Sequence, residues 1–237
     1  MDGSHAFSSA SVSEAVTQRI GFSPPPLRTL HGASSYKRHA RVVGGVSKRA
    51  FDIVASASAL LVLSPVLSAI WLAVRLESPG PGFFRQRRGG FQGRPFHIFK
   101  FRTMRTCESR VISQAKKEDD RTTRLGRFLR KTSIDELPQL INVLLGHMSI
   151  VGPRPHALAH DRQFSAIDRR YVSRHHARPG ITGHAQISGA RGATETREKV
   201  MERTTYDLHY VRNWSWAMDI KIIINTPLAL LRNRNVF

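Results

Sequence analysis

The sequence is poor in acidic residues and almost free of cysteine. Lys and Arg total 37 against 17 Asp and Glu, so the formal net charge is +20. Such an excess predicts an anionic partner, which could be nucleic acid, an acidic membrane face or a phosphorylated substrate. Cys107 is the single cysteine. An internal disulfide is therefore excluded, which fits a reducing compartment.

Residues 1–45 lack a sustained hydrophobic period, and no apolar run follows a basic start near Met1. They are rich in Ser, Ala, Gly and Pro. We therefore expect a disordered N-terminal segment over 1–45 and no cleaved signal peptide. The sequence has no internal repeat.

The run from Ile53 to Val74 contains no charged residue. At about 1.5 Å per helical residue, it could cross a hydrocarbon core of about 30 Å. Ser64 and Pro65 fall in its middle, where proline removes a helix hydrogen bond, and both flanks are basic, which favours the cytoplasmic side for each end. We predict a re-entrant helix–break–helix over 46–78 that breaks at Ser64 and Pro65. An ordinary transmembrane helix and a buried helix of a soluble core remain alternatives.

Proline and glycine between residues 78 and 82 separate this segment from a catalytic domain expected over 79–237. Aromatic and branched residues on both sides of the Gly-rich stretch 89–95 predict a β-hairpin. Lys100 and Arg102 alternate with phenylalanines, so in a strand both cations would project from one face. That face is either a polar outer surface or a phosphate site.

Asp135 and Glu136 stand just ahead of apolar residues that recur with helical spacing from 137 to 144. The helix start and the preceding Arg130 and Lys131 should lower the pKa of Asp135 and keep it ionised. One carboxylate could attack phosphorus while the other holds Mg²⁺, which prefers one or two carboxylates together with substrate phosphate oxygens. Simple capping of the helix is the alternative for an isolated acidic pair.

Two short motifs present an arginine beside proline and glycine. Arg154 lies between Pro153 and Pro155, which hold its backbone and present a guanidinium suited to phosphate. In the second motif, Arg178 precedes Pro179 and glycines whose amides could approach an anion. Each motif alone also fits a rigid turn, so only the combination with the acidic pair indicates a phosphate site.

Taken in order, these motifs resemble the bacterial sugar transferase family, the monotopic transferases that move a hexose-1-phosphate onto a polyprenyl phosphate. The resemblance runs from about Lys48 to the C-terminus. Its motifs are 48–52, the Ser64-Pro65 kink, 100–104, 133–139, 151–155 and 178–183. Segments near 206–210, 214–215 and 219–221 are similar to the branch that loads glucose or galactose phosphate. Many relatives of that branch carry further transmembrane helices upstream, so a minimal form is expected here.

The resemblance implies roles for individual residues. It implies that Asp135 forms a covalent phosphosugar intermediate and that Glu136 binds Mg²⁺. It implies phosphate-binding roles for Lys100, Arg102, Arg130 and Arg154. It also implies the re-entrant membrane hairpin.

The expected fold is α+β and mainly helical, with the membrane hairpin, a small β-hairpin and amphipathic interfacial helices. The expected activity is transfer of hexose-1-phosphate from UDP-glucose or UDP-galactose to undecaprenyl phosphate with release of UMP, the first step of exopolysaccharide repeat-unit synthesis. Another UDP-sugar, such as an N-acetylated one, is the alternative within this class. The expected location is the bacterial inner membrane, with the catalytic domain facing the cytoplasm, and a homodimer is left open.

Two readings from other classes compete with this one. A basic nucleic-acid-binding protein would account for the charge but not for the uncharged segment, and no helix-turn-helix or zinc-finger spacing is present. A non-catalytic membrane-surface protein would leave the acidic pair and the two arginine motifs unexplained. We therefore expect no nucleic-acid partner.

Overall fold

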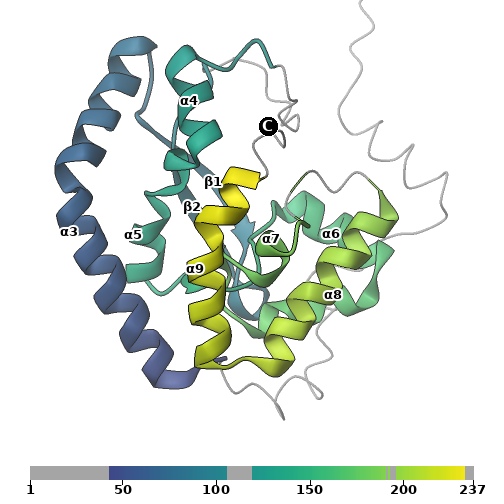
Figure 1. The fold of residues 1–237 in the computed structure, drawn as a ribbon. Coiled ribbons are helices and arrows are strands. Elements are labelled where there is room, and N and C mark those ends of the chain that lie inside the picture. Colours follow the sequence, from purple (N-terminus) through teal and green to yellow (C-terminus); the bar gives the residue numbers. More distant parts are fainter. Residues whose placement is uncertain (1–42, 106–118, 191, 193–195, 233–237) are drawn as a thin grey trace, which may run out of the picture. The chain divides into compact units, whose positions relative to one another are not determined.

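The computed structural model describes residues 43–105, 119–190, 192 and 196–232 (Figure 1). All of them belong to one compact unit, Ala40–Phe237. The disordered segment expected over 1–45 falls almost entirely outside the described residues, as does Cys107. The elements in chain order are α3 (Gly45–Glu77), β1 (Phe83–Gly89), η1 (Phe91–Gly93), β2 (Pro95–Phe101), α4 (Arg124–Thr132), η2 (Ile134–Glu136), α5 (Gln139–Leu144), β3 (Ser149–Val151), α6 (Leu158–Ile167), η3 (Arg169–His176), β4 (Gly180–Thr182), α7 (His184–Ile187), α8 (Arg197–Asn213) and α9 (Trp216–Arg232).

The predicted mainly helical fold with a small β-hairpin is confirmed. Strands β1 and β2 pair antiparallel, from Phe83 opposite Phe101 to Gly89 opposite Pro95. The short turn η1 joins them, and Gln92 adopts a positive φ of 54° within it. The buried face of β2 carries Phe96 and Ile98, which pack with Val143 and Met148.

A second pair of strands was not predicted. Strands β3 and β4 run parallel, with Val151 opposite Thr182. They come from the two arginine motifs, in which the Gly152 amide donates to Thr182 (2.9 Å) and the Gly180 amide to Pro153 (3.0 Å). A Cβ at Gly152 or Gly180 would collide with the facing backbone. These glycines therefore allow two strands to approach closely, and the two amides are not free to bind an anion.

Helix α3 is continuous over 33 residues, and Figure 1 shows it bowed along its length. The break predicted at Ser64 and Pro65 does not interrupt it, so the helix–break–helix is not confirmed. Pro65 has no N–H to donate to the carbonyl of Leu61, four residues before it. The Ser64 hydroxyl donates to that carbonyl instead, at 2.8 Å. This local repair satisfies the orphaned carbonyl and lets the helix pass through the proline.

The first turns of α3 are held by charged side chains. Lys48 forms a buried ion pair with Asp219 of α9 at 2.6 Å. Arg49 donates to the last carbonyls of α5, with 2.8 Å to Leu144. The carboxylate of Asp52 accepts from the amide of Ile150 at 3.0 Å.

The other end of α3 is held by the same unit. Buried Arg102 donates to the carbonyls of Val74 and Ser78, at 3.2 and 2.6 Å, and the Glu77 carboxylate accepts from the Leu125 amide at 2.9 Å. Val74 packs with Phe101 and other buried residues near α4. Both ends of the helix are therefore fixed to one polar scaffold.

The middle of α3 faces away from that scaffold. Leu61 and Val62 are 76% and 75% exposed. Among the described helices, α3 is the one long and apolar enough to cross a membrane, with a mean hydropathy of 2.2 over its most apolar stretch. Helix α9 also exposes apolar side chains at helical spacing, and these are Trp216, Ile220, Ile224, Leu228 and Leu231.

We predict that Asp219→Ala destabilises the fold. The Asp219 carboxylate accepts from Lys48 (2.6 Å), the Tyr210 hydroxyl (2.8 Å) and the Trp214 indole (3.0 Å). Its removal leaves a buried ammonium unpaired, which costs about 3–5 kcal/mol. Thermal unfolding in detergent should show a clear loss of stability, whereas Glu202→Ala, at an exposed position of α8, should unfold like the parent. Equal stability of the two variants would contradict this account of how α3 is anchored.

Candidate functional site

The acidic pair, Asp135 and Glu136, lies in the turn between α4 and α5. Helix α4 ends at Thr132, and Ser133, which follows it with a φ of 59°, reverses the chain. The short turn η2 follows, and Pro138 stands immediately before α5, where its fixed φ and missing N–H suit a helix start. Asp135 is 7% and Glu136 9% exposed. Two adjacent carboxylates are thus largely buried at the start of a helical segment.

Glu136 is held between two cations that are distant in sequence. The Lys100 ammonium, from the end of β2, lies 2.7 Å from its Oε1. Arg154 donates to both carboxylate oxygens, with 2.9 Å between Nη1 and Oε2. This bidentate geometry is the strong form of a guanidinium–carboxylate pair. Lys100 is farther from Asp135, at 4.0 Å from its Oδ2.

The two carboxyl groups have opposite protonation behaviour. Burial raises the pKa of Asp135 to about 6, and the charges of Lys100, Arg154 and Arg130 offset burial only in part. Burial also acts on Glu136, but Arg154 and Lys100 outweigh it and hold the pKa of Glu136 well below its ordinary range. The sequence-based expectation of a lowered pKa at Asp135 is therefore wrong. The nearest cations bind the neighbouring carboxylate instead.

The structure brings three of the five predicted phosphate ligands to the acidic pair. Lys100 and Arg154 contact Glu136 directly. Arg130, in the last turn of α4, contributes charge at Asp135, with its guanidinium 4.0 Å from the sulfur of Met104. Arg154 comes from the segment after β3, so strand pairing between the two arginine motifs sets its position.

The other two predicted phosphate ligands are engaged elsewhere. Arg102 follows the last residue of β2, and its guanidinium is bound to carbonyls at the end of α3. The expectation that it shares a strand face with Lys100 is therefore wrong. Arg178 lies over the ring of Phe91, at 5.4 Å, and donates to the Gly146 carbonyl at 3.2 Å. Neither contacts the acidic pair in the described part of the chain.

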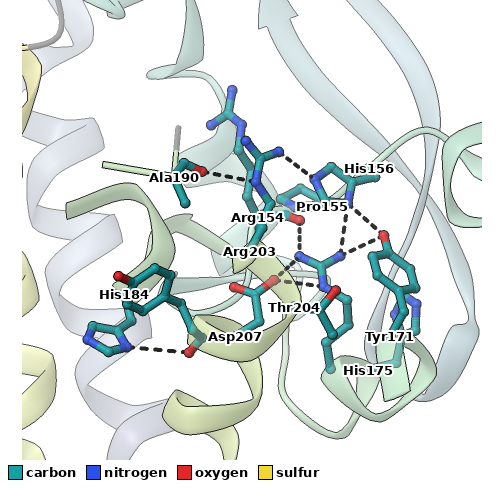
Figure 2. A network of polar contacts seen from close by, with 12 residues as sticks. Arg154, Pro155, His156, Tyr171, His175, His184, Ala190, Arg203, Thr204 and Asp207 are labelled. Atoms are coloured by element: carbon teal, nitrogen blue, oxygen red, sulfur yellow. Dashed lines mark hydrogen bonds and ion pairs between the residues drawn. The ribbon is translucent and has the colours of Figure 1, made fainter. Parts of the chain in front are cut away.

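A buried polar network holds the backbone of Arg154 in place, and it was not predicted (Figure 2). Arg174 donates to the backbone carbonyl of Arg154 and pairs with the Asp207 carboxylate at 2.8 Å. The same guanidinium reaches the Tyr171 hydroxyl at 3.1 Å. Its members come from η3 and α8, so no sequence spacing joins them. No pattern in the sequence could have found these residues, because charged side chains are ordinarily exposed and only the structure shows that Arg174 and Asp207 are buried.

His156 lies inside this network between Arg203 and Tyr171, as Figure 2 shows. Its Nδ1 is 2.6 Å from the Tyr171 hydroxyl and its Nε2 is 3.2 Å from Arg203. Burial and the charges of Arg174 and Arg203 hold the pKa of His156 well below its usual range. A neutral imidazole therefore separates two buried guanidinium groups.

The Mg²⁺ ion predicted at the acidic pair stays a prediction. Among the residues that the structure describes, no three His, Cys, Asp or Glu side chains gather as ligands. Mg²⁺ does not need such a cage, because it takes one or two carboxylates and fills its other positions with water and phosphate oxygens. Glu136 is the predicted ligand, and its two oxygens already accept from Lys100 and Arg154, so a metal ion there would share the carboxylate with these cations.

We predict that Asp135→Asn and Glu136→Gln change stability in opposite directions. The raised pKa of Asp135 means that the folded state binds its proton more tightly, so stability falls as pH rises from about 4 to about 6. At pH 8 the neutral Asn should therefore stabilise the fold by about 1–3 kcal/mol. Glu136→Gln leaves two cations without their partner and should cost about 3 kcal/mol.

Thermal unfolding in detergent at pH 8 and pH 5 measures both effects. The gain in stability from Asp135→Asn should be smaller at pH 5, because the Asp135 carboxyl of the parent is then largely protonated. If Asp135→Asn unfolded at a lower temperature than the parent at pH 8, burial of the Asp135 carboxylate would not cost the stability inferred here.

The sequence of this chain is similar to those of several characterised transferases. A UDP-glucose:undecaprenyl-phosphate glucose-1-phosphate transferase of Escherichia coli is 54% identical over 196 residues, which cover 82% of this chain and 42% of that protein. One of the same name from Caulobacter vibrioides is 50% identical, covering 83% and 74%. A UDP-N-acetylgalactosamine-undecaprenyl-phosphate N-acetylgalactosaminephosphotransferase of Aeromonas hydrophila is 41% identical, covering 78% and 43%. The chain thus spans less than half of two of these relatives. The profile of the bacterial sugar transferases matches residues 43–233, and the chain belongs to that family.

Proposed function

We propose that this protein transfers hexose-1-phosphate from a UDP-hexose, glucose or galactose, to undecaprenyl phosphate. The products are UMP and undecaprenyl-diphospho-hexose, which would begin an exopolysaccharide repeat unit. The main support for this proposal is the acidic pair. Lys100 and Arg154 hold Glu136 ionised, while Asp135 has a pKa of about 6. The names of the Escherichia coli and Caulobacter vibrioides relatives support UDP-glucose and undecaprenyl phosphate as substrates.

In the first step, a carboxylate oxygen of Asp135 attacks the phosphorus that bears the hexose. A bond forms between this oxygen and phosphorus, and the bond from phosphorus to the UMP oxygen breaks, so UMP leaves with the electron pair. With a pKa of about 6, Asp135 is largely ionised at neutral pH and retains more basicity than an exposed aspartate. Lys100 and Arg154 offset the charge that accumulates on the phosphate oxygens.

In the second step, the phosphate of the lipid attacks the same phosphorus. The acyl phosphate bond breaks, Asp135 recovers its carboxylate and the lipid carries a diphosphate-linked hexose. Glu136 would hold a Mg²⁺ ion, which would neutralise charge at the phosphate oxygens. Arg154 is suited to both steps, because its backbone is fixed by Arg174 and its guanidinium faces the acidic pair.

The location that fits this chemistry is the cytoplasmic face of the inner membrane. Both ends of α3 bind one polar unit, through Lys48 at one end and Arg102 at the other. A helix anchored in this way can place its exposed apolar middle in lipid while both ends stay on the same side. The exposed apolar side chains of α9 support an interfacial position for that helix also.

The activity is tested with a panel of UDP-sugars, undecaprenyl phosphate and Mg²⁺, followed as UMP formation. UMP should form with UDP-glucose or UDP-galactose, and the protein incubated with donor alone should gain the mass of a hexose phosphate on Asp135. Asp135→Asn should abolish UMP release and the added mass while remaining in the membrane fraction. Substantial turnover by Asp135→Asn would refute the nucleophile.

The same panel decides between sugars. Preference for an N-acetylated donor would favour the activity named for the Aeromonas hydrophila relative. Absence of UMP from every donor, together with salt-dependent binding of DNA in detergent, would favour a nucleic-acid-binding protein instead.

The topology is tested by labelling single cysteines near the two ends of α3. Ser47→Cys and Pro81→Cys occupy exposed positions, and each is introduced together with Cys107→Ser. In inverted inner-membrane vesicles, an impermeant maleimide should label both, and in intact spheroplasts it should label neither. Labelling of one position from each side would establish a spanning helix.

A further inference from the structure

A cavity of about 210 Å³ lies beside the acidic pair, and the steps above do not use it. Glu136 forms part of its wall. The rest comes from the turn after α4 and from β4, α7 and α9, and most of these side chains are aliphatic. Thr132, Ser133, Thr182, Gln186 and Thr226 are further polar side chains of the lining. The lining contains no aromatic ring and no cationic side chain among the described residues.

The three threonines have already used their hydroxyl protons. Each hydroxyl has one proton to donate and two lone pairs to accept with. Thr226 donates to the Ile222 carbonyl at 2.7 Å, so in its 2.7 Å contact with Thr182 the latter is the donor. Thr132 donates to the Phe128 carbonyl at 2.9 Å. The hydroxyl oxygens of these three threonines can therefore only accept a hydrogen bond from a ligand.

Gln186 adds another acceptor. Its amide nitrogen donates to the Ile181 carbonyl at 3.1 Å, which directs the side-chain oxygen elsewhere. That oxygen is buried and has no hydrogen-bond partner in the described part of the chain. A buried acceptor without a partner costs free energy that an incoming donor group would recover.

We propose that this cavity binds the hexose of the donor through its hydroxyl groups, an inference that rests on the proposed function. Hexose hydroxyls can donate to the threonine oxygens and, after a small adjustment of its side chain, to Gln186. The diphosphate has no proton to give at neutral pH, and an isoprenoid chain has no polar group to match these acceptors. Uracil offers one N–H between two carbonyls, and the lining has no ring on which it could stack.

The position of the cavity agrees with this choice. Glu136 is both a wall residue and the neighbour of Asp135, which attacks the phosphorus in the proposed reaction. The hexose is joined to that phosphorus through a single oxygen, whereas the base is separated from it by ribose and a second phosphate. A cavity that adjoins the acidic pair is therefore within reach of the sugar.

The test is Thr182→Val, which keeps the shape of the side chain and removes an acceptor. The KM for UDP-hexose should rise about fivefold, the effect of one hydrogen bond, while inhibition by UDP, which lacks the hexose, and the KM for undecaprenyl phosphate stay unchanged. Thr205→Val is the matched control. This threonine of α8 is exposed, donates to the Met201 carbonyl at 2.9 Å and is not part of the cavity lining. It should behave like the parent.

Gln186→Met is a second variant in case Thr182→Val does not fold, and it should give the same pattern. Weaker inhibition by UDP in parallel with the KM would assign the cavity to the nucleotide. A change confined to undecaprenyl phosphate would assign it to the lipid, and no change in folded variants would leave it without a substrate. Each of these three results overturns the proposal. An inactive parent with every UDP-sugar would instead refute the proposed function.

Discussion

The clamping of Glu136 between Lys100 and Arg154 is the interaction on which the rest of the site depends. It joins the end of β2, the turn before α5 and the segment after β3 at one buried carboxylate. Because the two cations lie nearest to Glu136, burial dominates at Asp135 and raises its pKa. Two neighbouring carboxyl groups therefore acquire different properties: Glu136 is firmly ionised, and Asp135 is the more basic of the two.

Arg154 can serve this clamp because the surrounding structure fixes its backbone. Paired strands β3 and β4 set the path of the chain on one side, and Arg174 with Asp207 holds the Arg154 carbonyl on the other. Ordering a long arginine side chain costs conformational entropy. Two flanking prolines and the buried network restrict the Arg154 backbone, so less conformational entropy remains to be lost on ligand binding. The acidic pair thus depends on helix α8, distant in sequence, for the orientation of its main cation.

Helix α3 presents an apolar surface to its surroundings while staying tied to this site. Arg102, expected at the phosphate, instead fastens the end of α3 to the chain that leads out of β2. The Ser64 hydroxyl takes the carbonyl that Pro65 leaves unpaired, so the helix bows without breaking. Arg102 stands two residues after Lys100, so the same stretch of chain contacts both the end of α3 and the acidic pair.

The sequence by itself determined the elements whose causes are local. The uncharged run of α3, the aromatic hairpin around its glycine turn and the helical pattern after Asp135 all follow from spacing along the chain. It also placed Lys100, Arg130 and Arg154 near the acidic pair, because the resemblance carried those positions. Only the tertiary structure decided which carboxylate the cations bind, that Arg102 and Arg178 lie elsewhere, and that Arg174, Asp207 and His156 meet behind Arg154. Ion pairing and burial depend on distances between segments far apart in sequence, and no local pattern encodes those distances.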